Sequence, residues 1–226
     1  MRIPLTRYGW PEVVIFPAAT AVAMTICPLL LVVVQWRSFF LMEAVLGIIL
    51  VWILSFFRDP DRQIQAGSNL LLAPADGKVT DIEEIEEKKF IGGKALRVGI
   101  FLSIFDAHIN RAPCNVRVEQ ITYRPGKYKN ARSRQAGQVN ESNDLGLFRT
   151  DSPNDRLIVR QISGAIARRI VCEARQGQEL ACGEKFGMIK FGSRTELYVP
   201  MREDVKCMVK KGDKVKAGVT IIVRYE

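Results

Sequence analysis

The sequence divides at two neighbouring apolar runs, VVIFPAATAVAMTICPLLLVVV at residues 13–34 and FFLMEAVLGIILVWILSFF at residues 39–57. The first run carries no charged residue, and the second carries only Glu43. A helix of about 20 residues crosses a bilayer core of about 30 Å, because each residue adds about 1.5 Å. The polar residues 35–38 between the runs are long enough only for a tight turn. The pattern therefore predicts a membrane helical hairpin whose two ends lie on the same side.

A cleaved signal peptide is the alternative interpretation of the first run. The run is too long for a signal peptide's apolar segment, has no small-residue cleavage site before Gln35, and leads at once into a second run. More arginines flank the hairpin than lie in its turn. They are Arg2, Arg7, Arg58 and Arg62, against Arg37. Basic residues favour the cytoplasmic side, so we expect residues 13–57 to anchor the chain on the cytoplasmic face of a membrane. Whether the hairpin spans the bilayer or re-enters it is left open.

The charge of the chain favours an anionic partner. Thirty-three Lys and Arg against 24 Asp and Glu give a net charge of +9, most of it in residues 59–226. A tethered basic domain is attracted to an anionic membrane surface. Nucleic acid gains no support, because the sequence has no aromatic-studded basic strand and no recognition helix. With 48% apolar residues the chain can bury a core, which excludes the disordered class.

Residues 59–226 have the pattern of a β-rich domain. Short apolar segments such as LRVGIFLSI at 96–104 and VRVEQITY at 116–123 alternate with glycine-containing turns, which predicts a sandwich or barrel. The stretches APADGKV at 73–79 and VKKGDKVKAG at 209–218 resemble the turn-and-strand units of hammerhead barrels. The polar stretch 128–155 is expected to form a long loop. The predicted fold is therefore mainly β, with hammerhead-like elements behind the helical hairpin.

Three side chains are candidates for chemistry. His108 is the only histidine of the chain and lies at the end of an apolar strand, among the polar residues of 106–111. Asp76 in Pro-Ala-Asp-Gly and Ser193 after Gly192 belong to patterns that are also ordinary turns. One histidine and five scattered cysteines cannot supply the three or four ligands of a usual metal site, so no metal is expected.

Three ordered motifs then give a resemblance that no single motif carries. They are APADGKV at 73–79, FDAHINRAP at 105–113 and KFGSRTELY at 190–198. Together with the N-terminal hairpin, they closely resemble the short bacterial form of the phosphatidylserine decarboxylase proenzymes, a pyruvoyl-dependent family. The resemblance extends over essentially the whole chain. It implies a carboxy-lyase of phospholipid biosynthesis at the bacterial inner membrane, which converts phosphatidylserine to phosphatidylethanolamine and CO2.

The resemblance also implies a zymogen that cuts itself. In the family a Gly-Ser bond is cleaved and the serine becomes a covalent pyruvoyl cofactor, which binds the amine of the substrate as a Schiff base. Mapped onto this sequence, the bond joins Gly192 to Ser193. A large chain of residues 1–192 and a small chain of residues 193–226 would then remain as partners, without a metal or an added cofactor.

Residue roles follow from the same resemblance. His108 matches the family's proton donor in decarboxylation, and Asp76 matches the aspartate that assists self-cleavage, which gives a triad of Asp76, His108 and Ser193. The long form of the family has a second histidine where this chain has Arg111, so the base that drives cleavage is left open. The motif Asn-Glu-Ser-Asn at residues 140–143 lacks an expected arginine, which leaves a contact to the headgroup phosphate there open as well.

Two other functions are compatible with parts of the pattern. A membrane-anchored hammerhead-barrel adaptor without catalysis would share the anchor and the two similar stretches, but such adaptors insert a coiled coil, and residues 80–205 contain no sustained heptad repeat. A pyruvoyl decarboxylase that acts on an ether-linked serine phospholipid would keep the chemistry. The sequence leaves homo-oligomerisation open.

Overall fold

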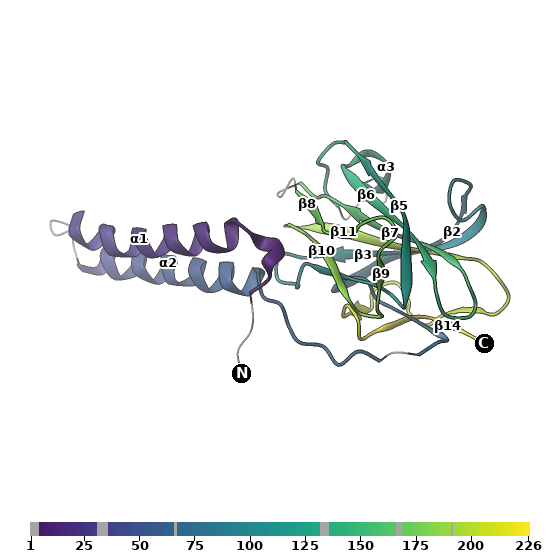
Figure 1. The fold of residues 1–226 in the computed structure, drawn as a ribbon. Helices are drawn as coiled ribbons and strands as arrows, with labels where there is room; N and C mark the ends of the chain where they lie inside the picture. Colours follow the sequence, from purple (N-terminus) through teal and green to yellow (C-terminus); the bar gives the residue numbers. More distant parts are fainter. Residues whose placement is uncertain (1–4, 31–35, 66, 132–135, 166–168, 191) are drawn as a thin grey trace. The chain divides into compact units, whose positions relative to one another are not determined.

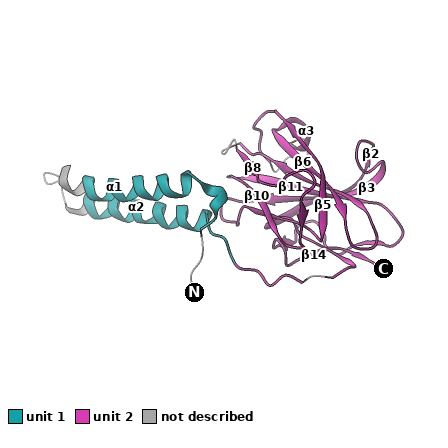
Figure 2. Cartoon of the chain, viewed as in Figure 1, with its two compact units in different colours: residues 1–60 teal, residues 61–226 magenta. Residues whose placement is uncertain are grey.

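The computed structural model describes residues 5–30, 36–65, 67–131, 136–165, 169–190 and 192–226. It consists of two compact units, Met1–Pro60 and Asp61–Glu226, which are coloured separately in Figure 2. The first unit is helical and the second is built mainly of strands. Each unit is described by itself.

Two apolar helices make up most of the first unit. A short 3-10 helix, η1 (Arg7–Gly9), precedes α1 (Glu12–Leu30) and α2 (Trp36–Phe56), which lie side by side in Figure 1. The segment before α1 is joined to the segment after α2, because Leu5 and Arg58 form an antiparallel bridge and Thr6 N donates to Phe57 O at 2.9 Å.

Membrane-spanning character is clearest in the second helix of this unit. Among the described residues, only Ser38–Phe56 is long and apolar enough to cross a membrane, while Glu12–Ile26 is a shorter apolar helix. The predicted first span extends into residues 31–35, and those residues lie outside the described part. One of the two predicted spans therefore has the length and composition of a membrane helix.

A curled eight-stranded antiparallel sheet, close to a half-barrel, dominates the second unit. In spatial order its strands are β13 (Lys214–Val215), β2 (Gly77–Glu87), β3 (Gly93–Leu102), β11 (Ser193–Pro200), β7 (Arg156–Ile162), β6 (Ser142–Arg149), β5 (Val116–Arg124) and β9 (Glu179–Leu180). Two three-stranded sheets complete the unit. They are β1 (Leu70–Leu72), β14 (Ile221–Tyr225) and β12 (Val205–Cys207), and β4 (Ile109–Arg111), β10 (Lys185–Ile189) and β8 (Ile170–Cys172). The prediction of a mainly β fold is confirmed.

The core lies against one face of the large sheet. Every second residue of β3, from Leu96 to Leu102, packs into it, as do Leu197 and Val199 of β11. These positions pair directly across the two strands, for example Leu197 with Val98, so their side chains lie on the same face. The opposite face of β11 carries charged side chains. This alternation decides which residues of β11 face the core.

The two similar stretches at 73–79 and 209–218 lie against each other. Lys214 pairs with Lys78 and Val215 with Gly77, and Gly218 N donates to Ala73 O at 2.9 Å. The pairing brings the front and the end of the domain together. It also fixes the backbone on both sides of Asp76.

The prediction of a loop over residues 128–155 is wrong. The stretch contains the short helix α3 (Ala136–Val139) and strand β6 at the centre of the β5-β6-β7 segment of the sheet. Leu145 and Leu147 are fully buried in the core, which stabilises the strand despite its polar beginning. The polar residues that resemble a loop are paired inside the domain. Asp144, for instance, accepts from Arg160 at 2.7 Å.

Candidate active site

Ser193 is the first residue of β11, a strand that lies between β3 and β7. It pairs with Leu102 of β3, and its side chain is fully buried. Its hydroxyl has no hydrogen-bond partner among the described residues. A buried polar group without a partner costs about 1–3 kcal/mol and is rare in folded proteins, so this hydroxyl is a candidate reactive group.

Gly192, directly before this serine, has a left-handed backbone with a φ of +64°. A Cβ placed on it would meet no atom within 4 Å, so the backbone angle and not crowding favours glycine here. A residue with a side chain would pay about 1–2 kcal/mol for this conformation. The open space also leaves the carbonyl of Gly192 sterically accessible from the side where a side chain would stand.

His108 directly precedes β4 and is fully buried. Its Nδ1 lies 2.8 Å from the carbonyl oxygen of Asp106, and a carbonyl can only accept, so Nδ1 carries the hydrogen. In the neutral ring Nε2 is then the proton acceptor. The Asp106 carboxylate is itself held, because it accepts from both N and Oγ of Ser103. The turn at 103–106 therefore fixes both the tautomer and the orientation of His108.

The backbone of His108 lies beside the end of β10. Ile189 N donates to His108 O at 3.2 Å, and the chain continues from Ile189 through residues 190–192 into β11. His108 and Ser193 are therefore contributed by neighbouring parts of the same end of the domain.

A chain of buried amides connects the two sheets next to these residues. Asn143 Nδ2 donates to Gln161 Oε1 at 3.1 Å, Gln161 Nε2 to Asn110 Oδ1 at 2.9 Å, and Asn110 Nδ2 to Thr195 Oγ1 at 3.0 Å. Asn110 follows His108 by two residues and Thr195 follows Ser193 by two. Since side chains two apart share a face of a strand, Thr195 lies on the face of Ser193, and the amide chain connects that face to β4, the strand that directly follows His108. No local pattern in the sequence indicates this chain of amides.

Asp76 lies just before β2 and is bound on both of its carboxylate oxygens. Oδ2 accepts from Arg62 at 2.6 Å, and Oδ1 accepts from the backbone N of Ala217 at 2.8 Å. The segment that carries Asp76 also contacts β4, because Pro74 O accepts from Arg111 N at 3.0 Å. Strand β4 thus touches the segments of Asp76 and Ser193 and directly follows His108. The structure brings the three segments together, while the triad itself stays a prediction.

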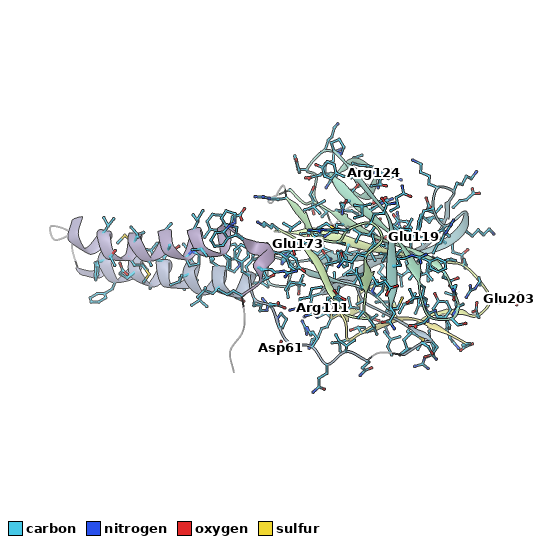
Figure 3. All side chains as sticks on the ribbon, in the orientation of Figure 1. Asp61, Arg111, Glu119, Arg124, Glu173 and Glu203 are labelled. Atoms are coloured by element: carbon cyan, nitrogen blue, oxygen red, sulfur yellow. The ribbon has the colours of Figure 1, made fainter. Side chains whose placement is uncertain are left out.

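Two other positions raised by the sequence have structural partners. Arg111, labelled in Figure 3, is buried and donates from Nη1 to Gly183 O at 3.0 Å. In the motif at 140–143, Asn140 binds the backbone of Lys129 and the carbonyl of Ser163, so it fixes the segment before β6. These bonds attach both positions to the protein scaffold.

The outer face of β11 carries a buried ion network that the sequence did not reveal. Arg194 is fully buried and donates to Asp81 Oδ1 at 2.7 Å and to Glu196 Oε1 at 2.8 Å. Burial opposes ionisation of Asp81, but the hydrogen bond and the charge of Arg194 outweigh it and lower the pKa of that carboxyl. Gly99 of β3 leaves room for the guanidinium, since a Cβ there would overlap it. The alternating pattern of β11 resembles a solvent-exposed face, which is why the network was missed.

No group of three or more His, Cys, Asp or Glu side chains suited to a metal occurs in the described part of the chain.

Comparison with known proteins agrees with the resemblance given by the motifs. The family model for phosphatidylserine decarboxylase matches residues 49–223. A phosphatidylserine decarboxylase proenzyme of Symbiobacterium thermophilum is 42% identical over 99% of this chain and 97% of its own length. Proenzymes of the same name from Carboxydothermus hydrogenoformans and Rhodopirellula baltica are 42% and 38% identical, over 79% and 99% of this chain and 82% and 89% of their own lengths. The chain therefore belongs to the phosphatidylserine decarboxylase family.

Proposed function

We propose that this protein decarboxylates phosphatidylserine to phosphatidylethanolamine, with a pyruvoyl group that it makes from its own Ser193. One observation carries the proposal. The chain belongs to a family whose members are named proenzymes, and it holds a fully buried serine hydroxyl without a described hydrogen-bond partner, directly after a left-handed glycine. A hydroxyl in that position is kept for a reaction with the neighbouring peptide bond.

Self-cleavage uses only atoms of the chain and one water molecule. Ser193 Oγ attacks the carbonyl carbon of Gly192, and the amide bond between the two residues is exchanged for an ester. Elimination then releases the carboxylate of Gly192 and leaves dehydroalanine at position 193. This group takes up water, loses ammonia and becomes the pyruvoyl group.

His108 is suited to handle the proton in this sequence. Because Nδ1 donates to the carbonyl of Asp106, Nε2 is the atom available to accept the hydroxyl proton of Ser193. A protonated Nε2 would afterwards supply the proton that replaces the carboxyl group of the substrate. Asp76 would assist from its position between Arg62 and Ala217.

The residues around position 193 fit a pyruvoyl group. Position 193 is buried at the start of the strand, and the group's carbonyl, once formed, would supply an electron sink for the departing carboxylate. The pairs of β11 with β3 begin at Ser193, so the proposed cut at Gly192 lies outside all of them. Arg194 adds an ion pair to Asp81 of the large chain, so the small chain would stay in place.

Membrane association is proposed for the same molecule. The helix Ser38–Phe56 has the composition of a membrane span, and the substrate is a membrane lipid. The net charge of +9 would attract the protein to an anionic leaflet, on the cytoplasmic side according to the flanking arginines.

The test is the intact mass of the purified full chain beside its Ser193→Ala variant. We expect two wild-type fragments that meet between residues 192 and 193, the smaller one lighter than its serine-terminated peptide by one ammonia. The variant should remain a single chain. In parallel, carboxyl-labelled phosphatidylserine should release labelled CO2 with the wild type, without added pyridoxal phosphate. Release of CO2 by an uncut chain would contradict the proposal.

A further inference from the structure

The start of β2 and the end of β3 form a cavity together with the turn before β13. Its volume is about 910 Å³, and its lining includes Lys78, Phe101, Ser103, Phe105, Lys211 and Lys214. We propose that this lysine pocket binds the phosphodiester of an anionic phospholipid at the bilayer surface, as a lipid site separate from Ser193. The inference rests on the membrane association proposed above, and it adds a second contact to the lipid.

The lysine pocket lies on the other face of the sheet from Ser193, although it shares Ser103 and Asp106 with the turn that holds His108. Lys78 pairs with Phe101, and Phe101 pairs with Arg194, so these three residues form one row across β2, β3 and β11. Arg194 points away from the core. Ser193 pairs with the core residue Leu102, so its side chain belongs to the opposite face. A lipid headgroup in the lysine pocket is thus not the one that reacts.

The lysines are arranged in a way that stability does not explain. Lys78 and Lys214 are directly opposite each other in the β2–β13 pair. Like charges that face each other across strands destabilise a sheet, because their Cβ atoms are only about 4.5–5.5 Å apart. Lys211 adds a third cation from the same turn. An anion bound between them would relieve this repulsion.

No carboxylate of the described residues neutralises the three lysines. All three are exposed, and none forms a described ion pair. Of the two aspartates that line the pocket, Asp81 is paired with Arg194, and Asp106 accepts from the neutral Ser103, so three lysine charges stand against the single charge of Asp106. The pocket therefore presents an uncompensated positive charge to solvent.

An exposed aromatic ring points to a lipid surface and not to a free phosphate ion. The side chain of Phe105 lines the pocket and is 69% exposed. Apolar rings beside basic residues are typical of segments that lie in the headgroup region of a bilayer. The pocket is also preformed, because Gly212 N donates to Val79 O at 2.8 Å and fixes the turn between Lys211 and Lys214.

Lysine reactivity in the full chain tests the proposal without relying on activity. The protein is placed in nanodiscs of phosphatidylcholine, with or without phosphatidylglycerol, and acetylated at its lysines before mass analysis. We expect phosphatidylglycerol to protect the three pocket lysines. Lys210 and Lys216 are matched controls, because they are exposed, adjoin the same turn and do not line the pocket. Equal protection of the controls would mean only general attraction to the surface and would overturn the proposal.

Paired variants sharpen the result. K211Q/K214Q and K210Q/K216Q remove the same charge, but only the first pair removes it from the pocket. The first should weaken the protection of Lys78 by phosphatidylglycerol about fivefold for each lysine, from the about 1 kcal/mol that a basic residue gains at an anionic leaflet. The second should leave that protection unchanged. Equal weakening by both pairs would contradict a specific site.

Two more arms separate the alternatives. In the first, inorganic phosphate or glycerophosphoglycerol is added to phosphatidylcholine nanodiscs, at the phosphate concentration that phosphatidylglycerol supplies in the lipid experiment. Neither compound should protect the pocket lysines from acetylation. Protection by either would indicate a site for soluble anions instead. The uncut Ser193→Ala variant should show the same protection as the wild type. The lysine pocket can therefore fail while the cleavage experiment succeeds, and the reverse also holds.

Discussion

The two faces of β11 satisfy their polar groups very differently. On the outer face, Arg194 and Glu196 are fully buried yet bind each other, and Arg194 also binds Asp81. On the inner face, the hydroxyl of Ser193 is equally buried and has no described partner. The saturated face fixes the strand, so the other face can hold a group whose polar atom is not yet satisfied. The contrast suggests that rigidity and reactivity are built on opposite sides of one strand.

The largest expected effect comes from removing the unsatisfied hydroxyl. Ser193→Ala should abolish both self-cleavage and CO2 release, because no nucleophile remains. Its stability should equal that of the uncut wild-type precursor or be up to about 1 kcal/mol higher, since an unpaired buried hydroxyl is lost. Ser163→Ala is the matched control, because Ser163 is also fully buried but its Oγ bonds Glu141 O at 3.2 Å. That variant should cleave normally and lose about 1 kcal/mol in thermal unfolding. If Ser193→Ala lost more stability than Ser163→Ala, the proposed contrast between a satisfied and an unsatisfied buried hydroxyl would be refuted.

The next effect concerns the proton carrier. His108→Asn keeps a donor for the carbonyl of Asp106 but removes the position of Nε2, whereas His108→Gln extends a polar group towards it. General acid and base groups contribute about 10²–10⁴-fold to rates. We expect both variants to lose that much CO2 release and to cleave slowly in a time course after synthesis, because neither amide can accept and return a proton. Full cleavage at the wild-type rate in His108→Asn would remove His108 from the cleavage step.

Arg194→Met disrupts the ion network on the outer face of β11. This change removes the nearest cation from Asp81 and Glu196, which keep only longer contacts to Arg97 at 3.4 Å and Arg160 at 3.8 Å. Removal of one partner of a buried pair costs about 3–5 kcal/mol. Thermal unfolding in detergent measures the loss. Lys206→Gln is the control, because its ion pair with Glu226 is exposed and such pairs are worth about 0–1 kcal/mol. A loss in Arg194→Met no larger than in the control would show that the network does not fix the strand.

The sequence predicted the strands better than it predicted their polar contacts. Residues 96–104 and 116–123 alternate in hydrophobicity and correspond to β3 and β5, because half-buried strands impose that period. Strand β6 was missed, since its polar first residues are satisfied by partners on β7 that lie far away in the sequence. The family motifs were sufficient to identify the relatives.

Side-chain pairing at the site had no local signal either. Arg62 binds Asp76 from 14 positions away and was interpreted only as part of the charge that flanks the hairpin. Arg194 binds Asp81 across 113 positions, and its alternation with apolar neighbours is the same as that of an exposed strand face. Such contacts depend on what covers the face. Here α3 contributes, because a Cβ on Gly137 would lie 2.9 Å from Glu196 Oε1.

A smaller effect is expected from the inner face away from the nucleophile. Thr195→Val removes the acceptor at the end of the amide chain and should cost about 1–3 kcal/mol, because Asn110 stays buried. Thr195→Ser keeps the oxygen and should lose less. If the amide chain also positions the strand of Ser193, Thr195→Val will slow cleavage while Thr195→Ser restores it. Equal rates in both variants would limit the chain to a structural role.

The smallest effect is a change in acid sensitivity. The pKa of Asp81 is lower in the folded chain than in the unfolded chain, where it is about 3.9. Its contribution to stability is therefore fully present above that value and is lost as the pH falls through the lower folded pKa. Glu87 has a lowered pKa as well, so the difference between wild type and Asp81→Asn isolates Asp81. The free energy of unfolding of both proteins is measured from pH 6 down to pH 2. The wild type should exceed Asp81→Asn by a constant amount at first, and this difference should shrink below about pH 4. An advantage that persists unchanged to the lowest pH would mean that Asp81 binds Arg194 without a lowered pKa, and that the ion pair does not fix the outer face of β11.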